Sequence, residues 1–378
     1  MLDESLLDAP EALARADRRG LLRGAAEAGA RVRTAARHAA EAGITELTPE
    51  GRPRAVMVAG SGTAAFGVAD LIAALAGASA PVTRIPPSGV APAAGAMRWT
   101  LPGWAGSVDL LLIATADGTE PGLALLAEQA YRRGCTVVAV APHRSPLREA
   151  VDGVHGLVVP MASAPHGEYD AETSAAGPGT LWALFTPLLA LLDRVGLVTA
   201  TPEALQSVAD RLDRTAERCG PAIATYSNPA KTLAAELADS LPLIWTEGDA
   251  AGPVGRRFAA VLAELSGRPA IAAELPEALP AHGALLAGTF AAGADPDDFF
   301  RDRVDETEPL HARVVLLRDR PTGGLSAAPA ARELALGHDT AISELEPEEG
   351  TELEALAELL AVTDFAAVYL SLASAAHP

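Results

Sequence analysis

The hydrophobic residues of the chain fall into short aliphatic runs that are separated by longer stretches with helical spacing. Such runs occupy residues 55–59, 81–87, 110–113 and 155–161 in the first half, where the segment 136–151 begins with a further one, and 241–248, 268–275 and 312–319 in the second. Most are continuous rather than alternating, which is typical of strands buried on both faces of a parallel sheet. The pattern therefore predicts an α/β protein.

The stretches between these runs predict helices that cover the sheets. Apolar residues recur every three or four positions at 11–43, which predicts one or two amphipathic helices, and at 180–197, 203–217 and 255–267. The chain ends with two helical patterns, at 351–361 and 364–375. We predict a helical segment at 1–50 and two α/β domains at 51–200 and 201–378.

Composition and charge narrow the possible partners. The 378 residues carry a formal net charge of −20, whereas nucleic acids and anionic membranes require a basic face. The longest apolar stretch, 181–192, is too short to span a membrane. Two cysteines, Cys135 and Cys219, give no disulfide framework, and the N-terminus lacks a secretory signal pattern. We therefore expect a cytoplasmic protein.

Two glycine-bearing turns each follow a buried run. The first, AGSGTAAFG, contains Gly60 and Gly62, which allow a ligand to approach the backbone. It lacks the third glycine and the later acidic residue of a dinucleotide site, and no lysine follows the glycines as in a P-loop. We predict no cofactor; a nicotinamide-dependent dehydrogenase is the least favoured alternative.

The second turn lies in ATADGTEPG. Thr119 is predicted to be the N-cap of the next helix, with Glu120 and Pro121 in its first turn. A loop at 163–179 holds His166 and three carboxylates, at 168, 170 and 172, but it lacks the second anchoring ligand of a metal site. We predict no metal.

The two turns, about 55 residues apart, resemble those of a sugar isomerase (SIS) domain. The segments RRFAAVLAELSG and IAAELPEALPAHGALL in the second half extend the resemblance to the bifunctional phosphoglucose/phosphomannose isomerase family, whose bacterial branch has tandem SIS domains. This resemblance implies two flavodoxin-like SIS domains, a homodimer and a sugar or sugar phosphate as ligand.

The family interconverts aldose and ketose phosphates by proton transfer between C1 and C2. By resemblance, Glu264 would be the base and His282 would assist ring opening. The residues implied to bind substrate are Gly60, Ser61, Gly62, Thr63, Thr115, Asp117, Gly118, Thr119 and Arg257.

Two departures from the family bear on activity. The family's phosphate loop reads Ser-x-Ser-Gly-x-Thr; aligned with residues 114–119, it loses two hydroxyl groups and acquires the charge of Asp117. Each lost hydrogen bond to a phosphate costs about 1.5–3 kcal/mol. The family's catalytic lysine has no counterpart, since the single lysine is Lys231, early in the second domain. Two hypotheses follow: an isomerase, or a non-catalytic protein that binds a sugar phosphate.

Overall fold

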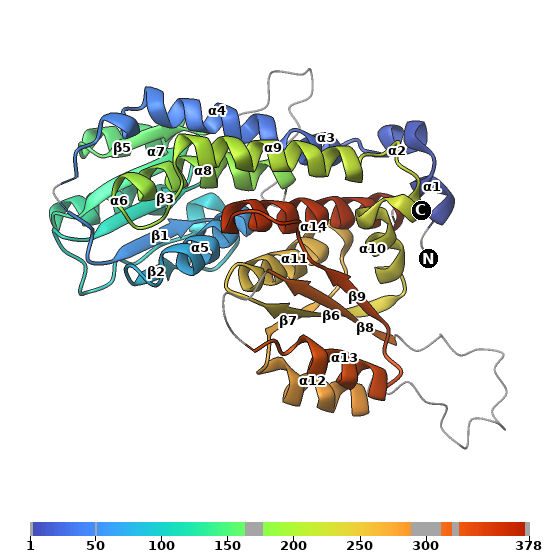
Figure 1. Ribbon diagram of the computed structural model, residues 1–378. Helices are drawn as coiled ribbons and strands as arrows, with labels where there is room; N and C mark the ends of the chain where they lie inside the picture. The colour runs from blue at the N-terminus through green and yellow to red at the C-terminus, as the bar shows by residue number, and fades with distance from the viewer. Residues whose placement is uncertain (1–2, 50, 163–176, 289–310, 320–324, 375–378) are drawn as a thin grey trace, which may run out of the picture. The chain divides into compact units, whose positions relative to one another are not determined.

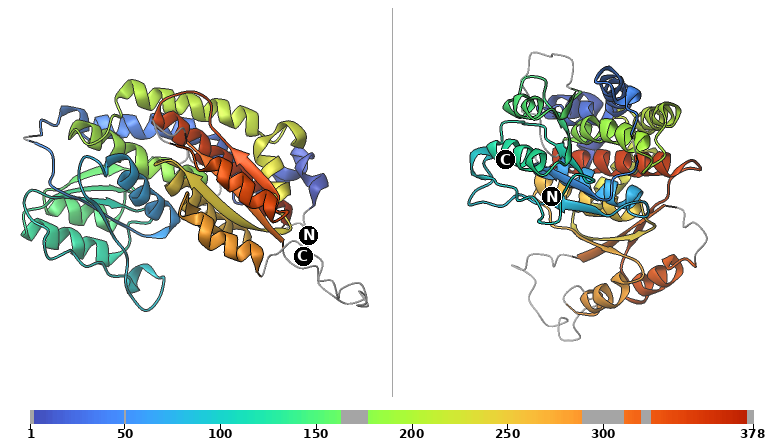
Figure 2. Two further views of the ribbon diagram at one scale, coloured as in Figure 1. Left: turned by 60° about the horizontal axis from the view of Figure 1, so that its bottom comes forward. Right: turned by 90° about the vertical axis from the view of Figure 1, so that its left-hand side faces the viewer.

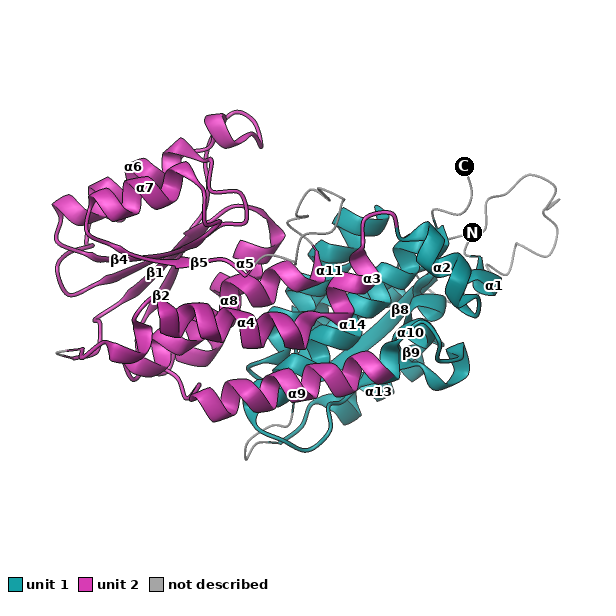
Figure 3. Cartoon of the chain, turned by 90° about the horizontal axis from the view of Figure 1, so that it is seen from above, with its two compact units in different colours: residues 1–17, 218–378 teal, residues 18–217 magenta. Residues whose placement is uncertain are grey.

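The computed structural model describes residues 3–49, 51–162, 177–288, 311–319 and 325–374. The chain forms two compact units, one of residues 18–217 and one of residues 1–17 with 218–378 (Figure 3). The N-terminal helices are thus divided between the units. The domain limits at 51–200 and 201–378 stay a prediction from the sequence.

The unit of residues 18–217 contains a five-stranded parallel sheet in the order β2-β1-β3-β4-β5. Its strands coincide with the aliphatic runs of the sequence: β1 (Val56–Gly60), β2 (Val82–Ile85), β3 (Leu110–Ala114), β4 (Thr136–Ala141) and β5 (Leu157–Pro160). All five residues of β3 are buried, because helices cover both faces of the sheet.

Helices α6 (Pro121–Arg132) and α7 (Pro146–Gly153) cover one face of this sheet. Helices α4 (Ala28–Glu41), α5 (Gly62–Ala76) and α8 (Pro178–Arg194) cover the other. The remaining helices of this unit are α3 (Leu21–Ala26) and α9 (Pro202–Cys219). Arg33 of α4 holds α9 through Asp210 and Asp213, each at 2.7 Å.

The second unit contains a four-stranded parallel sheet in the order β7-β6-β8-β9. Its strands are β6 (Ser240–Glu247), β7 (Ile271–Glu274), β8 (His311–Arg318) and β9 (Ile342–Leu345). Helices α10 (Pro229–Leu237), α11 (Ala251–Ser266) and α14 (Glu352–Ser374) lie on one face, and α12 (Ala278–Ala287) and α13 (Ala328–Gly337) on the other (Figures 1 and 2). The α/β class predicted from the sequence is confirmed in both units.

The N-terminal helices α1 (Glu4–Leu7) and α2 (Pro10–Ala16) belong to the second unit. The backbone N–H of Asp3 donates to Ala373 at the end of α14, at 3.1 Å. The carboxylate of Asp8 accepts hydrogen bonds from the backbone and the hydroxyl of Thr225, at 2.8 and 2.9 Å. These bonds tie the first residues of the chain to the C-terminal half.

The prediction of two separate helices at the C-terminus is wrong, because α14 is continuous. Asp364 interrupts the apolar pattern, but Arg257 of α11 neutralises it inside the fold, so the helix runs past it. Helix α14 is long and apolar enough to cross a membrane, yet 89% of its most apolar window is buried in the protein. It is a core helix.

Candidate functional site

The carboxyl ends of β1 and β3 form the switch point of the first sheet. From β1 the chain passes through α5 to β2 on one side, whereas from β3 it passes through α6 to β4 on the other. The two strands are neighbours and end level, with Gly60 paired to Ala114. In open parallel sheets, the crevice at such a point is where ligands bind. Both glycine-bearing turns predicted from the sequence therefore lie side by side.

The first of these turns approaches β3 closely and opens helix α5. A Cβ atom on Gly60 would lie 2.1 Å from the carbonyl oxygen of Ala114, so no larger residue fits there. Gly62 has a φ of +79°, which favours glycine. Ser61 is the N-cap residue of α5, and Thr63 lies in its first turn. The turn thus brings backbone N–H groups to the edge of the sheet.

The second turn is held by hydrogen bonds among its own residues. The hydroxyl of Thr115 accepts the backbone N–H groups of Asp117 and Gly118, at 3.2 and 3.1 Å. The hydroxyl of Thr119 donates to the Asp117 carboxylate at 2.7 Å. The predicted N-cap is wrong: Glu120 is the N-cap residue and Pro121 begins α6, while Thr119 bonds Asp117 instead.

Gly118 has a left-handed backbone conformation in this turn. Its φ is +72°, and a Cβ atom would lie 2.6 Å from Ser145. A residue with a side chain would be strained and crowded at this position, so the turn requires glycine here.

Glu120 is the residue of this site that the sequence analysis missed as a candidate. Glu120 is 1% exposed. Its Oε1 accepts hydrogen bonds from the hydroxyl groups of Ser61 in the first turn and of Thr115, the latter at 2.9 Å. Its Oε2 has no hydrogen-bond partner among the described residues. A carboxylate of the protein thus takes hydroxyl donors from both turns.

A carboxylate takes the same place at the switch point of the second sheet, between β6 and β8. Asp319 follows β8, and its Oδ2 accepts the backbone N–H groups of Ala250 and Ala251 at the start of α11, at 2.6 and 3.3 Å. It packs so closely on Gly248 that a Cβ atom there would lie 1.4 Å from Oδ1. A carboxylate of the protein itself therefore occupies the N-terminus of α11, where an anionic ligand could otherwise bind.

Glu247, at the end of β6, supports the neighbouring helix α13. It accepts hydrogen bonds from the side chains of Arg318 and Ser326 and from the backbone of Ala327. Burial opposes the charge on Glu247, but these hydrogen bonds prevail and lower its pKa. This carboxylate is part of the scaffold.

Arg257, predicted to bind substrate, is buried between α11 and α14. It is 1% exposed and forms an ion pair with Asp364, which is 3% exposed. Burial raises the pKa of Asp364, although the guanidinium opposes this. The pair holds the two helices together, and the role of Arg257 in binding stays a prediction.

Glu264 and His282 are not brought together. Glu264 is exposed near the C-terminal end of α11, about 20 Å along the helix from its start at the carboxyl edge of the sheet. His282 is buried in α12, on the opposite face. Their catalytic roles stay predictions.

The ring of His282 is fixed by the core. The indole N–H of Trp245 in β6 donates to its Nδ1 at 2.6 Å, so the ring accepts there as a neutral imidazole with its proton on Nε2. Burial lowers the pKa of His282 from its usual 6.5, in agreement with the neutral form.

The single lysine, Lys231, is buried and bound by backbone carbonyl groups. Lys231 is fully buried, and its Nζ donates to the carbonyl oxygens of Pro221 and Ile223 at 2.8 and 2.7 Å. The ammonium lies 5.5 Å from the ring centre of Tyr369. Burial lowers the pKa of Lys231. These contacts fasten the segment before α10 to α14.

Within the described ranges, no group of three or more His, Cys, Asp and Glu side chains is arranged to hold a metal ion. The acidic loop with His166, Glu168, Asp170 and Glu172, considered above as a metal site, lies outside the described residues. Cys135 and Cys219 are both free and buried.

Comparison with solved structures shows the fold of the whole chain. A proposed phosphosugar isomerase from Clostridium difficile 630 superposes with a TM-score of 0.60 at 12% identity, over 95% of this chain and 93% of that one. A proposed phosphosugar isomerase from Silicibacter pomeroyi DSS-3 superposes with a TM-score of 0.56 at 16% identity, over 94% of this chain and 97% of that one. The C-terminal domain of glucosamine-fructose-6-phosphate aminotransferase from Francisella tularensis superposes with a TM-score of 0.52 at 14% identity, over 94% of this chain and 96% of that one.

Comparison of sequences identifies the C-terminal half. No curated protein matches the chain. Residues 226–378 match the family described as the bacterial phospho-glucose isomerase C-terminal SIS domain. Residues 226–378 are thus similar to the C-terminal SIS domain of bacterial phospho-glucose isomerases, and the chain as a whole has the fold of the solved structures compared above.

Proposed function

We propose that the protein binds a carbohydrate derivative, such as a sugar phosphate, at the carboxyl edge of the five-stranded sheet. The observation that supports this most is the pairing of the two turns, at 60–63 and 115–120, across the switch point of that sheet. Both turns expose backbone N–H groups or short polar side chains, which suit a ligand with many hydroxyl groups.

We further propose that the protein does not turn this ligand over. Glu264 and His282 lie on opposite faces of the second sheet, and the nitrogen of Lys231 is engaged by two carbonyl groups. A base and a ring-opening group that serve one sugar must both reach it within hydrogen-bond distance. A binding or regulatory role agrees better with this arrangement than isomerisation does.

Aldose–ketose isomerisation, with Glu264 as base and His282 as helper, is the alternative, and it is favoured by the match of residues 226–378 to an isomerase family. A coupled assay with glucose 6-phosphate and mannose 6-phosphate separates the two. We expect no turnover above the uncatalysed rate. Turnover that falls steeply in Glu264→Gln, with an unchanged circular dichroism spectrum, would establish the isomerase instead.

Binding itself is tested by thermal-shift and calorimetric titration with hexose phosphates, amino-sugar phosphates, neutral hexoses and nucleotide sugars. We expect saturable stabilisation by at least one of these classes. A protein that responds to none of them would refute the proposal.

We also infer a cytoplasmic setting and a homodimer. Free buried cysteines and the acidic surface agree with a reducing cytoplasm, and the resemblance to SIS proteins implies a homodimer. Light scattering coupled to size exclusion tests the dimer; a mass of one chain, 38.6 kDa, at micromolar concentration would contradict it.

A further inference from the structure

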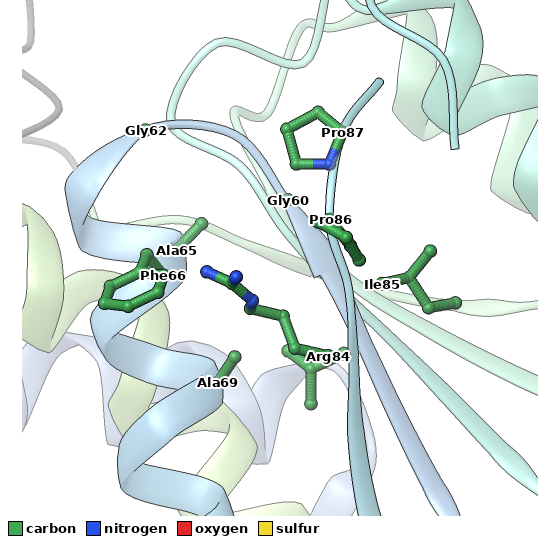
Figure 4. A pocket seen from close by; sticks show the side chains of 10 residues that line it. Gly60, Gly62, Ala65, Phe66, Ala69, Arg84, Ile85, Pro86 and Pro87 are labelled. Carbon is green, nitrogen blue, oxygen red and sulfur yellow. The ribbon is translucent and has the colours of Figure 1, made fainter. Parts of the chain in front are cut away.

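A small cavity opens beside the first glycine turn, between the ends of β1 and β2 and the first turns of α5 (Figure 4). Its volume is about 160 Å³. Gly60 and Gly62 form one wall, Ile85 and Pro86 another, and Phe66 of α5 a third. The cavity lies beside the turn assigned above to ligand binding, but it is distinct from the turn after β3.

Arg84 of β2 provides the charge in this cavity. Its guanidinium lies across the cavity toward α5, with Cζ 4.3 Å from the ring centre of Phe66. Stacking of this kind orients the planar group. Arg84 forms no hydrogen bond or ion pair with the part of the chain that the structure describes, and no carboxylate lines the cavity. Its five N–H groups are therefore available to an anion.

The size of the cavity indicates which part of a ligand fits. Sites that enclose a whole small molecule commonly measure about 300–1,000 Å³. A cavity about half as large as the smallest of these accommodates a single charged group, such as a phosphate or a carboxylate. The backbone N–H groups in the first turn of α5 add to the positive potential on one side of this space.

The cavity and Glu120 lie on two sides of the same turn. Gly60 and Gly62 line the cavity, whereas Ser61 between them donates to the carboxylate of Glu120. Glu120 retains a buried oxygen with no partner among the described residues. One side of the turn thus offers a cation, and the other offers an acceptor for a hydroxyl or an amino group.

We propose that the cavity at Arg84 binds the anionic group of the ligand, and that the carboxylate-bearing turn after β3 faces its hydroxyl or amino groups. The ligand class is then a sugar with one phosphate or carboxylate substituent. This inference rests on the proposed binding of a carbohydrate derivative and specifies its orientation. It assigns the anion to the turn after β1 and to β2, rather than to the turn that corresponds to the serine-rich loop.

Inorganic phosphate is the first probe, because it tests the cavity without any sugar. Calorimetric titration is carried out on the full chain, on Arg84→Met, and on Arg37→Met as the matched control. Arg37 is an exposed arginine of α4 whose nearest carboxylate, on Glu41, is 3.7 Å away. Methionine keeps an unbranched stem that can pack on Phe66, and both variants change the net charge equally.

We expect saturable binding of phosphate to the wild-type chain and to Arg37→Met, and affinity at least about tenfold weaker in Arg84→Met, as for the loss of one charge-assisted hydrogen bond. Equal affinity in Arg84→Met, or no saturable binding to the wild-type chain at millimolar phosphate, would overturn the inference.

Sugar ligands then separate this inference from the proposed function. Titrations with glucose 6-phosphate, glucuronate and glucose distinguish a phosphate, a carboxylate and no anion. We expect Arg84→Met to weaken the two anionic sugars and to leave glucose unchanged. If Arg84→Met binds all three as well as the wild type does, the function stands and the orientation is wrong. If phosphate requires Arg84 but no sugar binds, the cavity stands and the function fails.

Discussion

The hydroxyl of Ser61 donates a hydrogen bond to the carboxylate of Glu120, 59 residues further along the chain. This bond joins the turn after β1 to the turn after β3 at the switch point of the first sheet. The hydroxyl of Ser61 therefore binds a carboxylate of the protein, whereas it could otherwise bind a phosphate. The same principle operates in the second sheet, where Asp319 takes the N–H groups at the start of α11.

Replacing Glu120 with alanine is expected to destabilise the first unit. The variant leaves the hydroxyl groups of Ser61 and Thr115 without their acceptor, which costs about 2 kcal/mol of unfolding free energy. Asp117→Ala is the control in the same turn, because the Asp117 carboxylate is exposed and accepts the hydroxyl of Thr119, which is exposed as well. Urea denaturation monitored by circular dichroism gives both values. Equal losses in the two variants would show that the buried bonds add nothing.

Replacing Asp319 with alanine tests whether its carboxylate caps the start of α11 at the switch point of the second sheet. Loss of a carboxylate that accepts the first N–H groups of a helix costs about 0.5–2 kcal/mol. The neighbouring Asp249→Ala, at an exposed position, should change stability by less than about 0.5 kcal/mol. A loss in Asp249→Ala that matches the loss in Asp319→Ala would contradict a specific cap.

Lys231 should resist chemical modification in the folded protein. It is the only lysine, so an amine-reactive reagent can label just this side chain and the α-amino group. Because Lys231 is fully buried with its Nζ bound to two carbonyl groups, intact-mass spectrometry should record one label in buffer and two in denaturant. Labelling of Lys231 at the same rate in both conditions would refute its structural role.

Stability should fall as the pH drops below 6.5, in part because of His282. Burial keeps the folded pKa of this ring below the value of 6.5 in the unfolded chain, so the unfolded state binds the proton first. The contribution of His282 is therefore complete above pH 6.5 and decreases below it, by at most about 1.4 kcal/mol per pH unit.

The control for this effect is His282→Asn, whose amide oxygen can accept the indole N–H of Trp245 but does not titrate. The difference in unfolding free energy between wild type and variant should narrow from pH 7 to pH 5. A constant difference across this range would mean that His282 does not carry the pH dependence.

The sheets were predictable from the sequence because their strands are short, continuous aliphatic runs, such as 110–113, separated by stretches with helical spacing. The continuity of α14 was not, since Asp364 looks like a helix boundary until Arg257 is found beside it, 107 residues away in sequence. Likewise, the hydrogen bond that fixes the ring of His282 comes from Trp245, which lies on a different element, 37 residues away in sequence.

The site was predictable in part. The glycines marked both turns, because a turn at the end of a buried strand requires a left-handed or closely packed residue, as at Gly62 and Gly118. The importance of Glu120 was hidden, since a glutamate before a proline is a common start of a helix and its bond to Ser61 is tertiary.

Hydrogen–deuterium exchange in the presence of a saturating sugar ligand tests the central claim most directly. The account predicts slower exchange in peptides that cover the turns at 60–66 and 115–122, with little change around Glu264 and His282. Protection confined to peptides around 264 and 282, with the two turns unaffected, would contradict a binding site at the carboxyl edge of the first sheet.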